Sequence, residues 1–479
     1  MEVFPATAAL MLIWLVACLR DPDNSVLLAV AFVPFGMFAA VVLPSIGNLS
    51  LIAASVLAML AVGLTILRHL SPNHTGTVER NTTDIATFFY AAFTAYAVFS
   101  AIVLVRVFEG DFLVFPMSRG VEGVQVDVRF PSIMAPVGPS ASNLSQTMYL
   151  VLSFVFFLVC HGLFRRRGYN LGDTAIRLAA MINILLGILD FFRLDSILAF
   201  VRTSTYSLAN LHSIGSFDRI IGGFPEPSSF GAVSAAFFAY FTSAFLYSRR
   251  GQDAGLALAS GLLVLLSFSA SGYIAAGAFL ILLVWRARRL LYGQFDGHVF
   301  TAALGLGALI IAGVLAAVLF MPANGTIPFV IDALFVSKFE SVSGLERGAW
   351  ARSGFDAFNA TWWLGAGVGS LRSNGLLPVI LGSVGLPGAI LLLGFLFGAF
   401  AGRAPSSNEG RTAFFAAQAG AVALLGAAFV SATGPDLGLL VVTFAGIASL
   451  AKLEDRQNAQ RENRDAHYQH AAFIDTTLS

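Results

Sequence analysis

Charged residues are scarce in this chain. Lys, Arg, Asp and Glu make up 11% of its 479 residues and hydrophobic residues make up 57%, whereas a soluble domain carries about 25% charged residues. No soluble core can bury that much apolar surface, so the composition excludes an ordinary soluble protein. The formal net charge is only +1 and no large block of like charge occurs. A nucleic-acid partner is therefore not expected.

Cysteine and metal-ligand patterns are also scarce. The only two cysteines, Cys18 and Cys160, lie in apolar runs, where a disulfide framework or a cysteine-rich metal site is implausible. We recognise no cluster of His, Asp and Glu with the spacing of a metal site, so metal-independent chemistry without a cofactor is expected. The first apolar run lacks a preceding basic segment and a small-residue cleavage site, which predicts a retained helix rather than a cleaved signal peptide.

Long apolar runs dominate what is present. A membrane-spanning helix needs about 20 mostly apolar residues, because the hydrocarbon layer is about 30 Å thick and each residue rises about 1.5 Å. The runs predict an all-α polytopic membrane protein with about thirteen transmembrane helices. They lie near residues 3–19, 25–44, 49–67, 86–107, 147–164, 174–192, 229–247, 254–269, 271–286, 299–321, 373–399, 413–432 and 436–451.

Arginine-rich short connections set the expected orientation, since such loops tend to stay in the cytoplasm. Four connections qualify, and they agree with one another only if Phe268–Tyr273 is a true hairpin between two spans. The tail 452–479 is then cytoplasmic and the N-terminus lies outside. The four connections contain Arg165, Arg166 and Arg167; Arg249 and Arg250; Arg286, Arg288 and Arg289; Arg403 and Arg411.

This topology divides the chain into four parts. Residues 1–107 are N-terminal transmembrane helices, 108–146 an outer loop, 147–451 a membrane core with outer loops 193–228 and 322–372, and 452–479 the tail. Within the first outer loop, Val124–Phe130 alternates apolar and polar residues, which is typical of a short strand in a lid or decorated turn. Candidate functional residues are expected in the other two outer loops.

The second outer loop ends in the run from Arg219 to Gly231, which continues directly into an apolar helix. Pro227 and Ser228 suit a helix start, so Glu226 would lie at the positive end of that helix. Arg219 and Glu226 can be read as an interfacial anchor and a helix cap. They can equally be read as a basic site for a phosphate with a carboxylate beside it.

The third outer loop combines arginines with tryptophans. Arg347 and Trp350 lie one helical turn apart, and Arg352 and Asp356 are spaced i, i+4 on an expected amphipathic helix. Guanidinium groups bind phosphate bidentately and aromatic faces suit sugar rings, whereas tryptophans also form the interfacial belt of any membrane protein. Arg372, Trp362 and Trp363 complete this set.

Several further residues are weaker candidates. Gly365 and Gly367 form a glycine-rich turn that could bring backbone amides close to an anion, although no Lys-Ser/Thr follows to make it a nucleotide loop. Asn374 is followed by Gly385 and Gly388 inside the next expected helix, and small residues at helical spacing ordinarily mean tight helix packing. His212 is the only histidine expected outside; it is a possible general base, and a lone loop histidine is more often simply solvated. Arg177 and Asp190, thirteen apart, could mark a membrane site or simply face opposite ends of one helix.

Four segments resemble the polytopic Wzy-like polymerases of exopolysaccharide and O-antigen and the O-antigen ligases. Arg219–Gly231 looks like that family's outer loop, in which an Arg precedes a Glu-Pro-Ser turn, and Leu266–Tyr273 looks like its serine-rich hairpin. Ser343–Trp350, with the Gly-X-Gly turn, is similar to the Arg/Trp helix of the large outer loop. The Asn374–Gly388 spacing resembles the segment that opens the next helix, although many members have His near Asn374.

This resemblance implies a GT-C-like architecture and glycosyl transfer at the periplasmic face of the bacterial inner membrane. Undecaprenyl-pyrophosphate-linked glycans would be donor and acceptor, and a chain-length regulator a possible partner. Arg219, Arg347 and Arg352 would stabilise the pyrophosphate leaving group, and Glu226 would deprotonate the acceptor hydroxyl.

Three other functions stay open at this point. A ligase differs from a polymerase only in its acceptor. A secondary transporter or lipid-glycan flippase would gather ionisable residues near the middle of the membrane, whereas most charges here fall in outer loops. A scaffold subunit could use the same clusters for partner binding.

Overall fold

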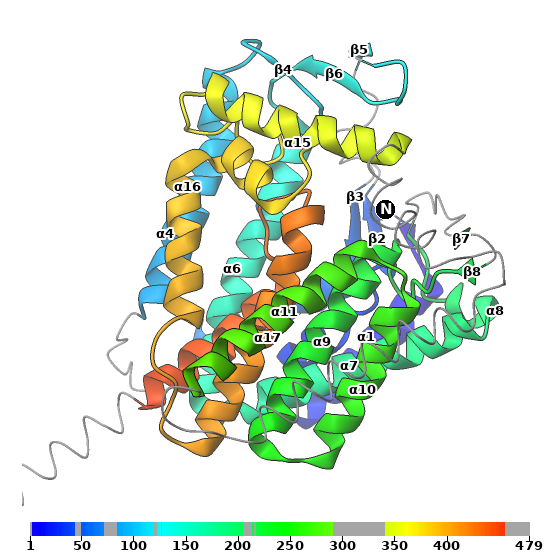
Figure 1. Ribbon diagram of the computed structural model, residues 1–479, viewed down its shortest axis with the longest axis vertical. Helices are drawn as coiled ribbons and strands as arrows, with labels where there is room; N and C mark the ends of the chain where they lie inside the picture. The colour runs from blue at the N-terminus through cyan, green and yellow to red at the C-terminus, as the bar shows by residue number, and fades with distance from the viewer. Residues whose placement is uncertain are drawn as a thin grey trace, which may run out of the picture.

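The computed structural model of the chain describes residues 2–43, 49–70, 84–117, 122–125, 127–204, 213–214, 217–290 and 341–455 (Figure 1). Seven helices in these ranges are long and apolar enough to cross a membrane, as expected for a polytopic helical membrane protein. They are α3 (Ala53–Leu70), the continuous run Ile85–Val107 formed by α4 (Ile85–Phe99), a π-helical turn and α5 (Val105–Val107), α6 (Ala141–Arg167), α7 (Asn170–Phe191), α9 (Pro227–Ser248), α16 (Leu376–Phe400) and α17 (Asn408–Ser431).

Shorter helices complete the described bundle. Three apolar segments belong to this group: α1 (Pro5–Arg20), α10 (Gly251–Leu266) and the stretch Ala270–Arg286 of α11 (Ala270–Leu290). Residues 438–455 form a final helix, and the four-residue α8 (Asp195–Leu198) follows α7. The span expected at 299–321 lies outside the described residues.

The prediction of one span at 25–44 is wrong. The helix α2 covers only Asn24–Ala31, and residues 39–43 form strand β2. Pro34 and Gly36 lie between them, and a proline cannot continue a helix without losing a backbone hydrogen bond. The next run likewise begins as a strand, β3 (Leu49–Ile52), before α3 starts. Hydropathy alone does not distinguish a buried strand from a buried helix.

These strands qualify the all-α prediction. With β1 (Glu2–Val3), they form an antiparallel sheet in the order β1-β2-β3 near the N-terminus (Figure 1). Val42 in the central strand lies opposite both Glu2 and Ser50. Two further small sheets occur in segments predicted as outer loops, β4-β6-β5 (Leu113–Val114, Ile133–Pro136, Val124–Gln125) and β7-β8 (Ser213–Ile214, Phe217–Asp218).

At the predicted hairpin Phe268–Tyr273, α10 ends at Leu266 and α11 begins at Ala270, so the chain forms two separate helices there. That both helices cross a membrane stays a prediction. The sheet β4-β6-β5 and the helix α15 (Val342–Ala360) lie at the upper end of the bundle in Figure 1, called here the α15 end. The turns at 249–250 and 401–407 lie at the lower end, called the short-turn end. Two of the four predicted arginine-rich connections therefore share one end, opposite α15.

The centre of the bundle is built around α9, in which 16 of 22 residues are buried. This helix packs against α10, α11 and α17, and its Phe237 and Phe241 are fully enclosed. A second pair, α4 and α16, stands beside this group (Figure 1). Tyr90 of α4 stacks on Phe395 of α16 with ring centroids 4.1 Å apart.

A break in α16 shapes the chain next to it. Gly385 has a φ of 62° and Pro387 follows two residues later, so the regular hydrogen bonding of the helix is interrupted. The carbonyls of Gly382 and Ser383 instead accept hydrogen bonds from the amides of Ala366 and Gly367, at 2.8 and 3.0 Å. The glycine-rich turn is therefore packed into the kinked helix.

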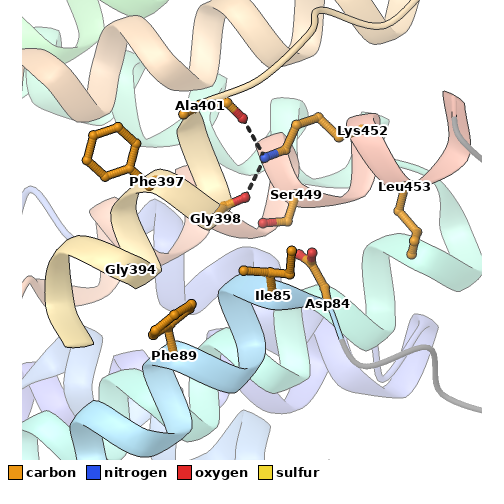
Figure 2. A pocket seen from close by; sticks show the side chains of 10 residues that line it. All are labelled: Asp84, Ile85, Phe89, Gly394, Phe397, Gly398, Ala401, Ser449, Lys452 and Leu453. Carbon is orange, nitrogen blue, oxygen red and sulfur yellow. Dashed lines mark hydrogen bonds between the residues drawn. The ribbon is translucent and has the colours of Figure 1, made fainter. Parts of the chain in front are cut away.

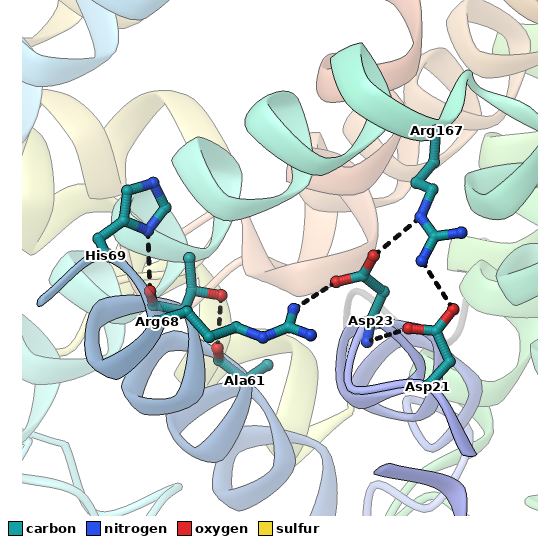
Figure 3. Close-up of polar contacts among 7 residues, drawn as sticks. Asp21, Asp23, Ala61, Arg68, His69 and Arg167 are labelled. Atoms are coloured by element: carbon teal, nitrogen blue, oxygen red, sulfur yellow. Dashed lines mark hydrogen bonds and ion pairs between the residues drawn. The ribbon is translucent and has the colours of Figure 1, made fainter. Parts of the chain in front are cut away.

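An ionic network ties three helices together at the short-turn end (Figure 3). The Asp23 carboxylate accepts Arg68 Nη1 at 2.7 Å and Arg167 Nε at 3.0 Å. Arg167 Nη2 also reaches Asp21 Oδ2 at 2.9 Å. The connection between α1 and α2 is thereby joined to the ends of α3 and α6.

Candidate functional site

Three of the predicted residues come together at the α15 end, although they are far apart in sequence. Arg219 follows β8, Glu226 is the N-cap residue of α9, and Arg347 lies in α15. Arg347 Nη2 is 3.8 Å from Glu226 Oε2, and both side chains are partly exposed. Ser228 Oγ donates a 2.8 Å hydrogen bond to the same carboxylate oxygen. The result is a basic site that contains one carboxylate.

Arg219 is the more enclosed of the two arginines. Its Nε donates to the carbonyl of Ser267 at 3.3 Å. Burial lowers the pKa of the Arg219 guanidinium from its ordinary value and the nearby charge of Arg347 acts in the same direction, while Tyr273 and Glu226 oppose the shift. Because an arginine keeps its proton at any physiological pH, two positive charges and one carboxylate lie close together.

A buried clamp fixes the backbone between Arg219 and Glu226. Asp190, at the end of α7, accepts the amides of Ile221 and Gly222 at 2.7 and 3.0 Å. Its other oxygen pairs with Arg202 Nη2 at 2.6 Å, and Arg202 Nε donates to the Gly222 carbonyl at 3.0 Å. Both side chains of this pair are 12% exposed. The clamp holds the loop that carries the candidate site.

The serine-rich hairpin supports the other side of that loop. Ser271 Oγ donates to the Ser228 carbonyl at 2.9 Å, in the first turn of α9. Gly231 and Gly272 face each other so closely that a Cβ on Gly272 would lie 3.0 Å from the Gly231 Cα. Small residues are therefore needed where α9 crosses the hairpin, and this contact brings Ser267 to Arg219.

Trp350 and Arg372 form a second group one turn farther along α15. The Arg372 guanidinium lies 4.9 Å from the centre of the Trp350 ring, a cation–π geometry. Trp350 Nε1 donates to Ser132 Oγ at 3.2 Å, and Ser132 donates to Glu346. These contacts dock α15 against the chain just before β6. Trp350 and Arg372 thereby support the helix that carries Arg347.

Gly365 and Gly367 have a structural use that leaves their amides occupied. Gly365 N donates to Thr361 Oγ1 at 3.0 Å, and Gly367 N donates to the Ser383 carbonyl at the break in α16. Both residues are buried. The expectation that this turn presents amides to an anion is therefore not supported. Asn374 is similarly engaged, since its Nδ2 donates to the Val430 carbonyl at 3.1 Å near the end of α17.

The remaining outer-loop candidates lie in different surroundings. Arg352 is an exposed residue of α15, as is Asp356. Trp362 and Trp363 follow the end of α15 with exposures of 78% and 57%, which fits interfacial tryptophans. His212 lies outside the described residues.

Arg177 and Asp190 lie near opposite ends of α7 and have separate partners. This agrees with the interpretation that they face opposite ends of one helix. Arg177 lies between Asp173 and Asp253, at 2.7 and 2.6 Å, near the short-turn end. Tyr240 donates to Asp173 at 2.9 Å, and Ser248 donates to Asp253 at 2.7 Å. This group lines a cavity of about 210 Å³ that is bordered by α7, α9 and α17.

Sequence reasoning missed the residues that position the site. Arg202 and Ser267 were not selected, and Asp190 was only a weak candidate. The useful signal was an acidic residue at the end of an apolar helix, which needs a partner in or near the membrane. Arg202, twelve residues later, is that partner. Ser267 acts through its backbone carbonyl, which residue type cannot reveal.

No protein-family model, curated protein or solved structure matches this chain.

Proposed function

We propose that the chain is a polysaccharide polymerase that transfers glycans from undecaprenyl pyrophosphate at the outer face of a bacterial inner membrane. The observation that carries this proposal is the meeting of Arg219 and Arg347 around Glu226, within a multi-pass helical protein. A pyrophosphate is the ligand class that suits two clustered guanidinium groups. The family resemblance of these segments adds the sugar chemistry and a GT-C-like architecture to the proposal.

In the proposed reaction, the acceptor is a sugar hydroxyl of a lipid-linked repeat unit. Its oxygen forms a bond to the anomeric carbon of the donor glycan, and its proton passes to the Glu226 carboxylate. The bond from that carbon to the pyrophosphate oxygen breaks, and the lipid pyrophosphate leaves with the electron pair. Arg219 and Arg347 stabilise the negative charge that develops on the leaving group. The step needs no further reactant.

The location of the charged residues favours this reaction over transport. A transporter places its binding site near the middle of the membrane between broken helices. Here α16 is broken, but the freed carbonyls of Gly382 and Ser383 are taken up by the glycine-rich turn. The arginine pair lies instead at the α15 end, outside the described apolar helices α9 and α10. A ligase would use the same arrangement with a different acceptor.

The test compares Arg219→Ala and Arg347→Ala with Arg129→Ala in cells that make the polymer. Arg129 is an exposed outer-loop arginine paired with Asp127 at 2.6 Å, which makes it a matched control. We expect both site variants to accumulate single repeat units on the lipid carrier, while Arg129→Ala makes polymer of normal length. Normal polymer from stably inserted site variants would contradict the proposal. Full-length lipid-linked polymer that is not passed on would indicate the ligase instead.

A further inference from the structure

A second polar site lies at the short-turn end, opposite the arginine pair. It is a cavity of about 280 Å³ between the start of α4, the end of α16 and the helix 438–455 (Figure 2). Asp84 and Ser449 contribute its acidic and hydroxyl groups, and Phe89 and Phe397 contribute aromatic rings. None of these residues takes part in the proposed transfer reaction.

Two buried oxygens at this cavity lack a hydrogen-bond partner among the described residues: Asp84 Oδ2 and Ser449 Oγ. Ser449 is 1% exposed. The two side chains come from different helices and extend toward the same space in Figure 2. Asp84 as a whole is half-buried, but an enclosed carboxylate oxygen without a donor is unfavourable. The arrangement therefore calls for a ligand that is positively charged and donates more than one hydrogen bond.

Lys452 does not supply that donor to Asp84 Oδ2. Its ammonium group is directed at the end of α16, where it donates to the carbonyls of Gly398 and Ala401, the latter at 3.1 Å (Figure 2). A cation is favourable there because helix dipoles leave partial negative charge at C-termini. The cavity thus has a positive group on one wall and an unsatisfied carboxylate oxygen on another.

The rim of the cavity is apolar and faces outward. Ile85 is 56% exposed and Phe397 is 67% exposed. In a bundle that crosses a membrane, such outward apolar side chains contact lipid chains. A ligand with a polar head and acyl chains can fill the cavity and lie against this rim, whereas a free ion would leave the rim unused.

We propose that this cavity binds the headgroup of an aminophospholipid, with its primary ammonium donating to Asp84 Oδ2 and Ser449 Oγ. The headgroup phosphate then lies toward the wall that carries Lys452. A trimethylated ammonium has the same charge but no N–H donor, so an ethanolamine headgroup is selected over a choline headgroup.

The experiment measures lipid binding to the purified full chain by native mass spectrometry. Phosphatidylethanolamine is compared with phosphatidylcholine of identical acyl chains, and free phosphoethanolamine tests whether the headgroup alone suffices. The variants are Asp84→Asn and Ser449→Ala, with Asp111→Asn, an exposed outer-loop residue, as the control. Thermal melting of each variant verifies folding.

We expect phosphatidylethanolamine to bind roughly tenfold more tightly than phosphatidylcholine, a preference that Asp84→Asn abolishes and Ser449→Ala weakens. Asp111→Asn should keep it. Binding of free phosphoethanolamine with the same dependence on Asp84 would support a headgroup site that does not need acyl chains. Equal binding of the two lipids, a preference that survives Asp84→Asn, or full competition by sodium at constant ionic strength would overturn the proposal.

Discussion

The two ends of the bundle handle charge differently. At the short-turn end, Asp23 is held by two arginines at 2.7 and 3.0 Å, and Arg177 is held by two carboxylates at 2.7 and 2.6 Å. At the α15 end, Arg347 pairs with Glu226 at the longer distance of 3.8 Å, and Arg219 lies within the electrostatic influence of both residues. Tight, matched pairs join helices, whereas a surplus of positive charge with one loosely held carboxylate is suited to an anionic ligand.

The largest expected effect tests the loosely held carboxylate. Glu226→Gln should lower the rate of polymer formation by roughly 10²–10⁴-fold, because it removes the proposed general base. Thermal stability should barely change, since a partly exposed pair contributes less than about 1 kcal/mol. Polymer length on gels and thermal melting measure the two effects. Glu122→Gln, at an exposed position, is the control, and normal polymer from Glu226→Gln would remove Glu226 from the mechanism.

The buried clamp behind the site should instead affect stability. Asp190→Ala leaves Arg202 buried without its partner, so we expect a loss of about 3–5 kcal/mol in the free energy of unfolding. Asp195→Ala is the matched control, because Asp195 is 78% exposed and 3.8 Å from the same arginine. It should cost less than about 1 kcal/mol. If denaturant unfolding shows equal losses of unfolding free energy for the two variants, the Asp190–Arg202 pair does not stabilise the protein as proposed here.

The glycine-rich turn provides a test of the packing of Gly367 against the backbone of Ser100. Gly367 has a φ of 99°, and a Cβ there would lie 2.7 Å from the Ser100 carbonyl oxygen. Gly367→Ala should therefore lower the free energy of unfolding by about 1–3 kcal/mol. Gly438 has a φ of 76° with no atom within 4 Å of a Cβ, so Gly438→Ala reports backbone strain alone. Thermal melting should show the larger loss for Gly367, and the reverse order would contradict the packing described here.

The smallest effect is expected at the short-turn end. Asp23→Asn weakens the contacts to Arg68 and Arg167 and should cost about 1–2 kcal/mol, with polymer formation unchanged. Asp21→Asn touches one arginine and is more exposed, so it should cost less. A loss of polymer from Asp23→Asn at normal protein levels would mean that the two ends are functionally coupled.

Much of the fold could be predicted because hydropathy and helix length are local properties. The runs that became α7 and α9 were placed within four residues of their observed bounds, and those that became α6 and α17 within six. The segment 25–44 was not, because its apolar residues satisfy both a short helix and strand β2. The break in α16 was also missed, although Gly385 and Pro387 were visible in the sequence.

The candidate site was harder to predict, because its geometry comes from long-range contacts. Arg219 and Glu226 were selected at the end of one loop and Arg347 on an expected helix within another, and the structure brings them together. Gly365 and Gly367 were selected as a glycine-rich turn that could present its amides to an anion, and they are packing residues, since their amides are used inside the protein. Tertiary contacts determine which backbone amides and carbonyls remain available to bind a ligand, and these contacts cannot be read from residue types in the sequence.

The most direct test of the central claim is the affinity of the purified chain for undecaprenyl pyrophosphate, which requires no knowledge of the sugar. Undecaprenyl monophosphate and an Arg129→Ala variant are the controls. The account predicts that the native chain prefers the pyrophosphate and that Arg219→Ala and Arg347→Ala each weaken its binding by roughly tenfold or more. Equal binding of both lipids, or unchanged affinity in both variants, would contradict an anion site at the α15 end.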